Sequence, residues 1–439
     1  MRSSGIWLAT TIAVCGFVAV PATSWAQQAP APGDAAAQAL RQEIAQLRTE
    51  FEARLAALEA KLSATGGGAA PPAPEPAAQT AAAPAAQVPP GAEGAGGPGG
   101  ALPVYGGGSA ASKVFNPDMA VVGNFLGVGG SNSVNPAPAM EMRESEVSFQ
   151  AIVDPYARAD FFLAFGETGV DLEEGYVTFP TLPGGLLMKV GKLRASFGKL
   201  NTAHTHILPW ADRPLVTENL VGGEEGIGDA GFSVARLIPN PWIFLEATGQ
   251  VFRGDSGDIF HSSERSDLSV IGRLRGYHDI TESTNVDLGA SYARGHNASG
   301  IVDQTDLGRF TTELVGVDAT IRWKPLRRSI YHSFVARTEG VFSRREQPDG
   351  RQSSKGFYVS GDYQLARRWF TGARYDASDR ADDSSARDTG QSLLLTYWPS
   401  EFSQIRGQFR RTKYAEGVTA NELLFQFQFS IGAHGAHPF

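Results

Sequence analysis

Cysteine is nearly absent from this sequence of 439 residues, which contains only Cys15. That residue lies inside an apolar stretch near the N-terminus. The rest of the chain therefore has no thiol, which excludes disulfide bonds, thiolate metal sites and a cysteine nucleophile.

Long apolar runs are also absent after the first stretch, so no later segment has the roughly 18 apolar residues of a membrane-spanning helix. The first stretch has its own pattern. Arg2 precedes an apolar run over residues 6–20, and the small residues Ser24 and Ala26 follow. This pattern predicts a signal peptide over residues 1–26 and export from the cytoplasm.

An excess of positive charge is missing as well. The formal net charge is −8, which does not suggest a nucleic-acid partner. Neither G-x-S-x-G nor H-E-x-x-H occurs, so we expect no enzymatic activity and no cofactor.

Two regions follow the predicted signal peptide. Residues 37–62 predict a periplasmic coiled-coil helix, because apolar residues recur three or four apart. These residues are Leu40, Ile44, Leu47, Phe51, Leu55, Leu58 and Leu62. The stripe favours self-association, with an isolated helix as the alternative. Residues 63–112 contain mostly Ala, Pro and Gly and predict a disordered linker.

The remaining region, residues 113–439, alternates apolar and polar residues over segments of about ten residues. In "ELLFQFQFSI", for example, Phe425 and Phe427 share one face, and Gln426 and Gln428 share the other. Period two indicates β-strands. Sixteen such segments occur, and short connections tend to alternate with longer polar ones, as in an up-and-down barrel of the outer membrane.

The fold class predicted from this pattern is all-β, with a 16-stranded antiparallel transmembrane β-barrel. A soluble sandwich is the alternative, but charged residues on the second strand face disfavour it. We predict that they line the pore wall. They are Arg158, Asp160, Arg273, Arg275, Asp318, Arg322, Arg374, Asp376, Arg406 and Arg410.

Several passages carry a family resemblance. "EEGYVTF" (173–179) and "MKVGKLRASFGKLN" (188–201) are similar to the phosphate-selective porins of the O and P type. "HTHILPW", followed by "DRPLV", and the ending "FQFQFSIGAHGAHPF" resemble porin-like outer-membrane proteins, some of which are labelled zinc-regulated receptors. The resemblance implies a bacterial outer-membrane porin, a homotrimer, and a third external loop that folds inward and narrows the channel.

That third loop is predicted over residues 196–229, after the fifth strand. Acids on the loop that face wall arginines would set a field across the pore, or they would be ordinary solvated charges. The residues predicted for this constriction are His204, His206, Trp210, Asp212, Arg213, Glu218, Glu224, Glu225 and Asp229.

His204 and His206 leave two interpretations open. An H-x-H pair on extended chain can direct both rings to one side and bind a metal, with Asp212, Glu218 or Glu224 as further ligands. The alternative is a structural pair packed with Trp210 and Pro209. His434 and His437 are less suitable partners, because an even number of strands places the C-terminus at the opposite end of the barrel from this loop.

The sequence as a whole predicts a passive porin in outer-membrane lipid. Its water-filled channel would carry small hydrophilic solutes or ions and would prefer anions. The alternative function is a metal-binding or zinc-uptake receptor that uses the histidine loop.

Overall fold

The computed structural model describes residues 117–166, 169–257, 259–302, 305–306 and 309–432. The predicted signal peptide, helix and linker (residues 1–112) lie outside these residues, and so do His434 and His437. Within the described residues, no helix is long and apolar enough to span a membrane.

Sixteen long strands make up the wall. They are β1 (Asp118–Ser131), β2 (Met140–Asp154), β3 (Ala157–Gly166), β4 (Gly169–Leu182), β5 (Leu186–Arg194), β6 (Gly228–Leu237), β7 (Phe244–Phe252), β8 (Ser269–Thr281), β9 (Thr284–Asn297), β12 (Phe310–Trp323), β13 (Phe334–Gln347), β14 (Gly350–Ala366), β15 (Trp369–Asp379), β16 (Arg387–Ser400), β17 (Ser403–Lys413) and β18 (Thr419–Gly432).

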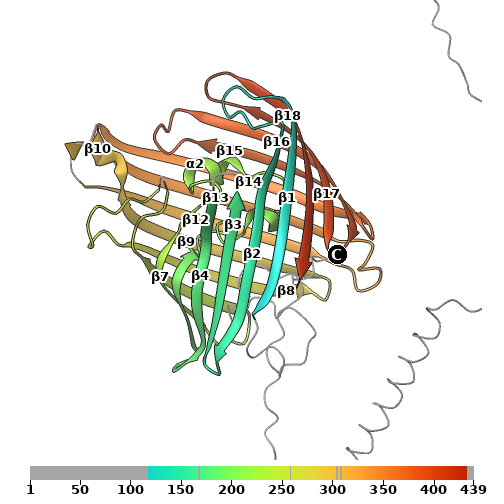
Figure 1. Ribbon diagram of the computed structural model, residues 1–439, viewed down its shortest axis with the longest axis horizontal. Coiled ribbons are helices and arrows are strands. Elements are labelled where there is room, and N and C mark those ends of the chain that lie inside the picture. The colour runs from blue at the N-terminus through green and yellow to red at the C-terminus, as the bar shows by residue number, and fades with distance from the viewer. Residues whose placement is uncertain (1–116, 167–168, 258, 303–304, 307–308, 433–439) are drawn as a thin grey trace, which may run out of the picture. The chain divides into compact units, whose positions relative to one another are not determined.

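Each wall strand pairs antiparallel with its neighbours in sequence, and β1 pairs with β18 to close the barrel (Figure 1). The closing register places Phe125 opposite Phe427. A small separate ladder, β10 (Ile301–Val302) with β11 (Thr305–Asp306), follows the 3-10 helix η3 (Ala298–Gly300) in the connection from β9 to β12. The predicted 16-stranded barrel is confirmed, and each predicted segment corresponds to one wall strand.

The strands turn their apolar faces outward. On β18, the Phe427 side chain is 37% exposed, whereas its neighbour Gln426 is 1% exposed. The same alternation along the other strands gives an apolar outer surface and a polar inner one, the reverse of a soluble protein. The soluble-sandwich alternative is therefore wrong.

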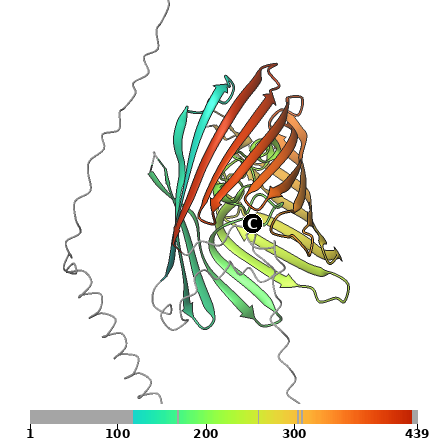
Figure 2. The same cartoon turned by 90° about the vertical axis from the view of Figure 1, so that its right-hand side faces the viewer.

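One connection dominates the interior. Residues 195–227 join β5 to β6 and contain the 3-10 helix η2 (Thr205–Ile207) and the helix α2 (Leu215–Leu220). This segment, called the inserted loop below, lies within the ring of strands in both views (Figures 1 and 2).

Candidate functional site

The inserted loop is packed inside the barrel. Its helix α2 contacts β13, β14, β15 and β16. Phe197, Trp210, Val216 and Leu220 are fully buried in one apolar cluster with wall residues such as Leu314. Burying apolar side chains away from water lowers the free energy of the packed loop. The inserted loop is therefore held inside the barrel by apolar packing against the wall.

Asn201 closes the base of the inserted loop. Its amide nitrogen donates to the carbonyl oxygens of Ala195 and Ile227, each at 2.8 Å, and its carbonyl oxygen accepts from the Ile227 amide at 2.8 Å. Gly226 sits beside it with a φ of +60°, where a Cβ atom would lie 2.2 Å from the Asn201 oxygen. Both ends of the loop are thus joined by one buried side chain.

The turn at Gly198 docks on one arc of the wall. Gly198 donates from its amide to Ser291 Oγ at 3.0 Å, and its carbonyl accepts from Arg273 at 2.5 Å. The amides of Lys199 and Leu200 both donate to the Glu339 carboxylate at 3.3 Å. These contacts join the loop to β8, β9 and β13.

Asp212 joins the loop to a second arc, on β15 and β17. Its carboxylate pairs with Arg374 at 2.9 Å and Arg410 at 3.0 Å, and accepts from Gln408 at 2.6 Å. Burial alone would raise the pKa of Asp212, but the two guanidinium groups hold it well below its usual range. The carboxylate is therefore ionised at neutral pH.

Trp210 strengthens the same contact. Its ring lies edge-on to Tyr358 at 5.2 Å, and the Arg374 guanidinium stands 4.8 Å from its centroid, a cation–π distance. Arg406 donates to the carbonyl of Leu208 at 3.1 Å and to Gln426 at 2.7 Å. Two wall arginines thus bind the loop backbone and the loop tryptophan directly.

His204 joins the loop to a third arc, on β2 and β4. Its Nδ1 lies 2.7 Å from a Glu146 oxygen and 2.6 Å from a Glu173 oxygen, and its Nε2 lies 3.0 Å from Glu174. Glu174 also accepts from the Arg194 amide at 2.6 Å. Burial alone would lower the pKa of His204, but these carboxylates raise it well above its ordinary value.

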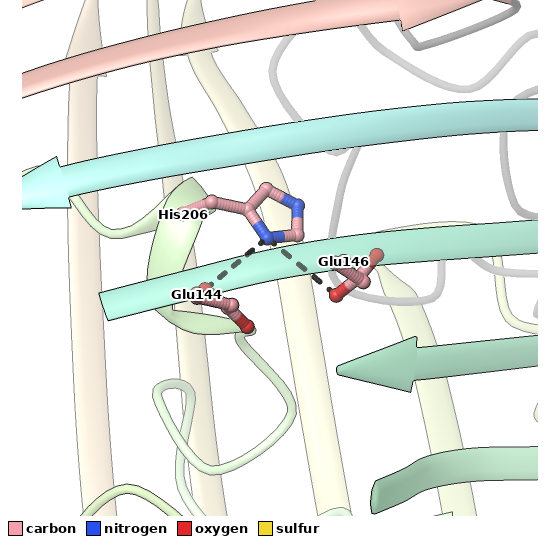
Figure 3. A group of neighbouring side chains, drawn as sticks. All are labelled: Glu144, Glu146 and His206. Atoms are coloured by element: carbon pink, nitrogen blue, oxygen red, sulfur yellow. Dashed lines mark ion pairs between the residues drawn. The ribbon is translucent and has the colours of Figure 1, made fainter. Parts of the chain in front are cut away.

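His206 faces two of the glutamates on β2 (Figure 3). Its Nδ1 lies 3.9 Å from Glu144 and 3.5 Å from Glu146. Burial would lower the pKa of His206 too, but Glu146 and Glu144 raise it. Two groups of possible metal ligands result, and they share Glu146. One is Glu144, Glu146 and His206, and the other is Glu146, Glu173 and His204.

Two β-bulges build this cluster. In β2 the pairing with β1 skips Arg143, and in β4 the pairing with β3 skips Glu173. A bulge places an extra residue against the partner strand and redirects side chains. Glu173 and Glu174 are adjacent in sequence and would point to opposite faces of a regular strand, yet both carboxylates contact His204.

The predicted constriction residues differ in burial. His204, His206, Trp210, Asp212 and Arg213 are buried inside the barrel, and Arg213 donates to the Ala203 carbonyl at 2.7 Å. The side chains of Glu218, Glu224 and Glu225 are exposed. Glu224 pairs with Arg143.

The prediction that Asp229 belongs to the loop is wrong, because Asp229 lies in β6. It accepts from the Asp255 amide at 2.8 Å and pairs with Arg253 at 3.1 Å. Strand β6 begins at Gly228, whereas the sequence analysis extended the loop to Asp229.

The partners expected for the histidines also need correction. In the described part of the chain the metal-ligand groups take their carboxylates from β2 and β4, and Asp212, Glu218 and Glu224 belong to neither group. Trp210 packs on Tyr358, while His204 packs on Phe162 at 5.1 Å. The sequence signal for the missed residues was the spacing of Glu144 and Glu146, which places two carboxylates on one strand face.

The predicted wall residues all lie on strands, with side chains turned from the outer surface, but most of their charges are paired. Arg273 pairs with Asp318 at 2.9 Å. The other pairs are Arg158 with Asp160 at 2.9 Å, Arg275 with Asp287 at 2.8 Å, Arg374 with Asp376 at 2.9 Å and Arg410 with Glu422 at 2.7 Å; Arg322 lies 4.0 Å from Asp287. The wall therefore presents local ion pairs more than a bare row of cations.

No protein-family model matches this sequence. An uncharacterized protein of Aquifex aeolicus (strain VF5) is 29% identical over 385 residues, covering 74% of this chain and 81% of that protein. Among solved structures, OprB of Pseudomonas putida has a TM-score of 0.49 and 11% identity, and covers 73% of this chain and 95% of its own.

The anion-selective porin from Comamonas acidovorans has a TM-score of 0.50 and 11% identity, and covers 72% of this chain and 99% of its own. At this identity the likeness concerns the fold. The described barrel therefore has the fold of the bacterial outer-membrane porins.

Proposed function

We propose that this protein is an outer-membrane porin, a passive water-filled channel for small hydrophilic solutes or ions. The observation that carries the proposal is the inserted loop, which crosses a closed barrel with a polar inner face and an apolar outer face. An apolar outer band is suited to lipid, and a polar interior is suited to water.

The inserted loop would form the constriction. It contacts three arcs of the wall, through Gly198, Asp212 and His204, so solutes would pass between these contacts. Around Asp212, Arg374 and Arg410 are also paired with Asp376 and Glu422, and Arg406 binds the neutral partners Leu208 and Gln426, so Arg406 is the guanidinium of this region with no ion pair among the described residues. Because the other wall arginines are mostly paired, we propose only a modest preference for anions.

The resemblance of residues 173–179 and 188–201 to the phosphate-selective porins supports this proposal. These residues carry the bulge at Glu173 and the docking turn at Gly198, so the similar passage positions the inserted loop. A homotrimer is part of the same proposal, since the resemblance implies one.

Single-channel recording in planar bilayers tests this function. Purified protein should give discrete steps of ohmic current in potassium chloride. In a salt gradient, the reversal potential should shift slightly toward the anion value. Replacing Arg322, a lumen arginine that is not bound to the inserted loop, by Gln should reduce that shift, because wall charge biases the local ion population.

A second candidate is a metal-uptake receptor that uses the histidine loop. The observation that favours it is the convergence of His204 and His206 with glutamates of β2 and β4. Zinc flux into protein-containing vesicles, much faster than the flux of magnesium, would favour this second candidate over a general porin.

A further inference from the structure

His206, Glu144 and Glu146 form a group whose geometry differs from that around His204. The Nδ1 atom of His204 lies within 2.7 Å of two carboxylate oxygens, which is the spacing of a charged hydrogen bond. The Nδ1 atom of His206 lies 3.5 Å and 3.9 Å from its two carboxylates. These distances are too long for hydrogen bonds of that kind.

The wider spacing suits a metal ion. With zinc bonds of about 2.0–2.1 Å in a tetrahedral site, neighbouring ligand atoms are roughly 3.3 Å apart. The spacings around His206 are close to that value, and the ligand atoms of the group all lie within 4.8 Å of one another. An ion placed between them would require only small side-chain movements.

Glu144 provides an independent indication. Its side chain is only 7% exposed, yet neither of its carboxylate oxygens accepts a hydrogen bond. A buried carboxylate without donors is costly unless a cation compensates it. Figure 3 shows this carboxylate beside the His206 ring, next to Glu146.

The charge of the surroundings points the same way. Four carboxylates, those of Glu144, Glu146, Glu173 and Glu174, converge on two imidazoles. Arg194 pairs with Glu173 at 3.4 Å, and Glu173 is not one of the three residues of this group. With neutral imidazoles, the cluster would carry an excess of negative charge, which a divalent cation would offset.

We propose that His206, Glu144 and Glu146 bind one divalent transition-metal cation of the zinc type, and that this ion fastens the inserted loop to β2. Mixed imidazole and carboxylate ligands suit such ions better than magnesium or calcium, which prefer oxygen ligands alone. The ion would be a resident part of the constriction, and this role rests on the proposed porin function.

The test uses the full chain without an affinity tag, folded in detergent and stripped of metal. His434 and His437 are replaced by Asn in every sample, so that they cannot contribute to binding. Zinc binding is measured by titration calorimetry and by elemental analysis. The test variants are Glu144→Gln and His206→Asn. The controls are Glu141→Gln, a carboxylate on the same strand, and His278→Asn, an exposed histidine at the end of β8.

We expect about one tightly bound zinc per chain in the parent and in both controls. The zinc affinity should fall by about tenfold or more in either test variant, because even residues that only hydrogen-bond to a metal ligand contribute about 10–100-fold to metal affinity. Heat-modifiable gel mobility checks that each variant is folded. Absence of bound zinc in the folded parent, or equal affinity in the test and control variants, would overturn the site and indicate protonated histidines as the counter-charge.

Planar-bilayer recordings test the fastening role. Zinc should reduce fluctuations of the open-channel current in the parent, chelation should restore them, and Glu144→Gln should respond to neither. Zinc binding without any such change would overturn the fastening role. Channels that form without zinc binding would leave the porin function standing, whereas zinc binding without channels would leave only the metal site.

Discussion

At the scale of single residues, Asp212 is the most consequential charge of the inserted loop. Asp212→Asn would remove a carboxylate shared by the buried Arg374 and the partly buried Arg410, which keep Asp376 and Glu422 as partners, so the loss should be smaller than the about 3–5 kcal/mol that breaking an isolated buried ion pair costs. We expect a lower unfolding temperature and a noisier channel. Thermal unfolding followed by circular dichroism measures the first effect. Asp383→Asn, an exposed acid in another loop, should change neither property.

The pH dependence of the Asp212 contribution follows from its lowered pKa. A carboxyl group whose pKa is lower in the folded state stabilises the fold above its unfolded pKa and loses that effect as the pH falls through the folded value. The difference in stability between wild type and Asp212→Asn should therefore be constant from neutral pH down to about pH 5 and shrink only in more acidic solution. A difference that disappears near pH 6 would contradict the ion pair.

Gly198 tests whether docking of the loop sets the width of the channel. Its φ is +58°, and a Cβ atom would lie 1.7 Å from a Glu339 oxygen. Gly198→Ala should therefore lift the turn from β13 and raise single-channel conductance. Gly417→Ala is a matched control, because Gly417 has a φ of +80° with open space around it. Equal conductance in the two variants would show that docking at Gly198 does not limit the current.

At the scale of elements, the register of β18 has a direct test. Phe427 points outward and Gln426 inward, where Gln426 bonds to Arg406 at 2.7 Å and to Asn124 at 3.0 Å. Phe427→Arg should cost about 2–4 kcal/mol in the bilayer and lower the membrane yield. Gln426→Glu gives Arg406 a carboxylate partner and should assemble normally. Similar yields of the two variants would rule out this register.

The strands could be predicted from the sequence because a membrane barrel enforces period two on every segment. Phe425 and Phe427 alternate with Gln426 and Gln428 for this reason, and the same pattern located all sixteen strands. Lipid outside and polar groups inside leave little freedom at each position.

The site was less predictable, since it depends on departures from that pattern. The bulges at Arg143 and Glu173 leave no mark in the composition, yet they turn neighbouring side chains toward His204 and His206. The glutamates of β2 and β4 are far from the histidines in the chain. The inward folding of the inserted loop against β2 and β4 brings them within contact distance, so local spacing could identify the histidines but not their partners.

At the scale of the whole molecule, the segment before the barrel should affect assembly. The predicted helix over residues 37–62 lies outside the described residues, and we expect it to bundle with two copies of itself in the periplasm. Deleting residues 27–112 should leave a trimer of lower heat stability if the barrel walls associate directly. A monomeric product, by light scattering in mild detergent, would make the helix the main contact. An intact protein that is itself monomeric would contradict the trimer.

The central claim is that the barrel carries a water-filled path past the inserted loop. The most direct measurement is the current through single molecules of the purified, folded protein in a planar bilayer. We predict discrete and ohmic conductance steps in potassium chloride, which become larger in Gly198→Ala. Folded protein that inserts into the bilayer without producing any current steps, in the wild type and in Gly198→Ala alike, would contradict the claim.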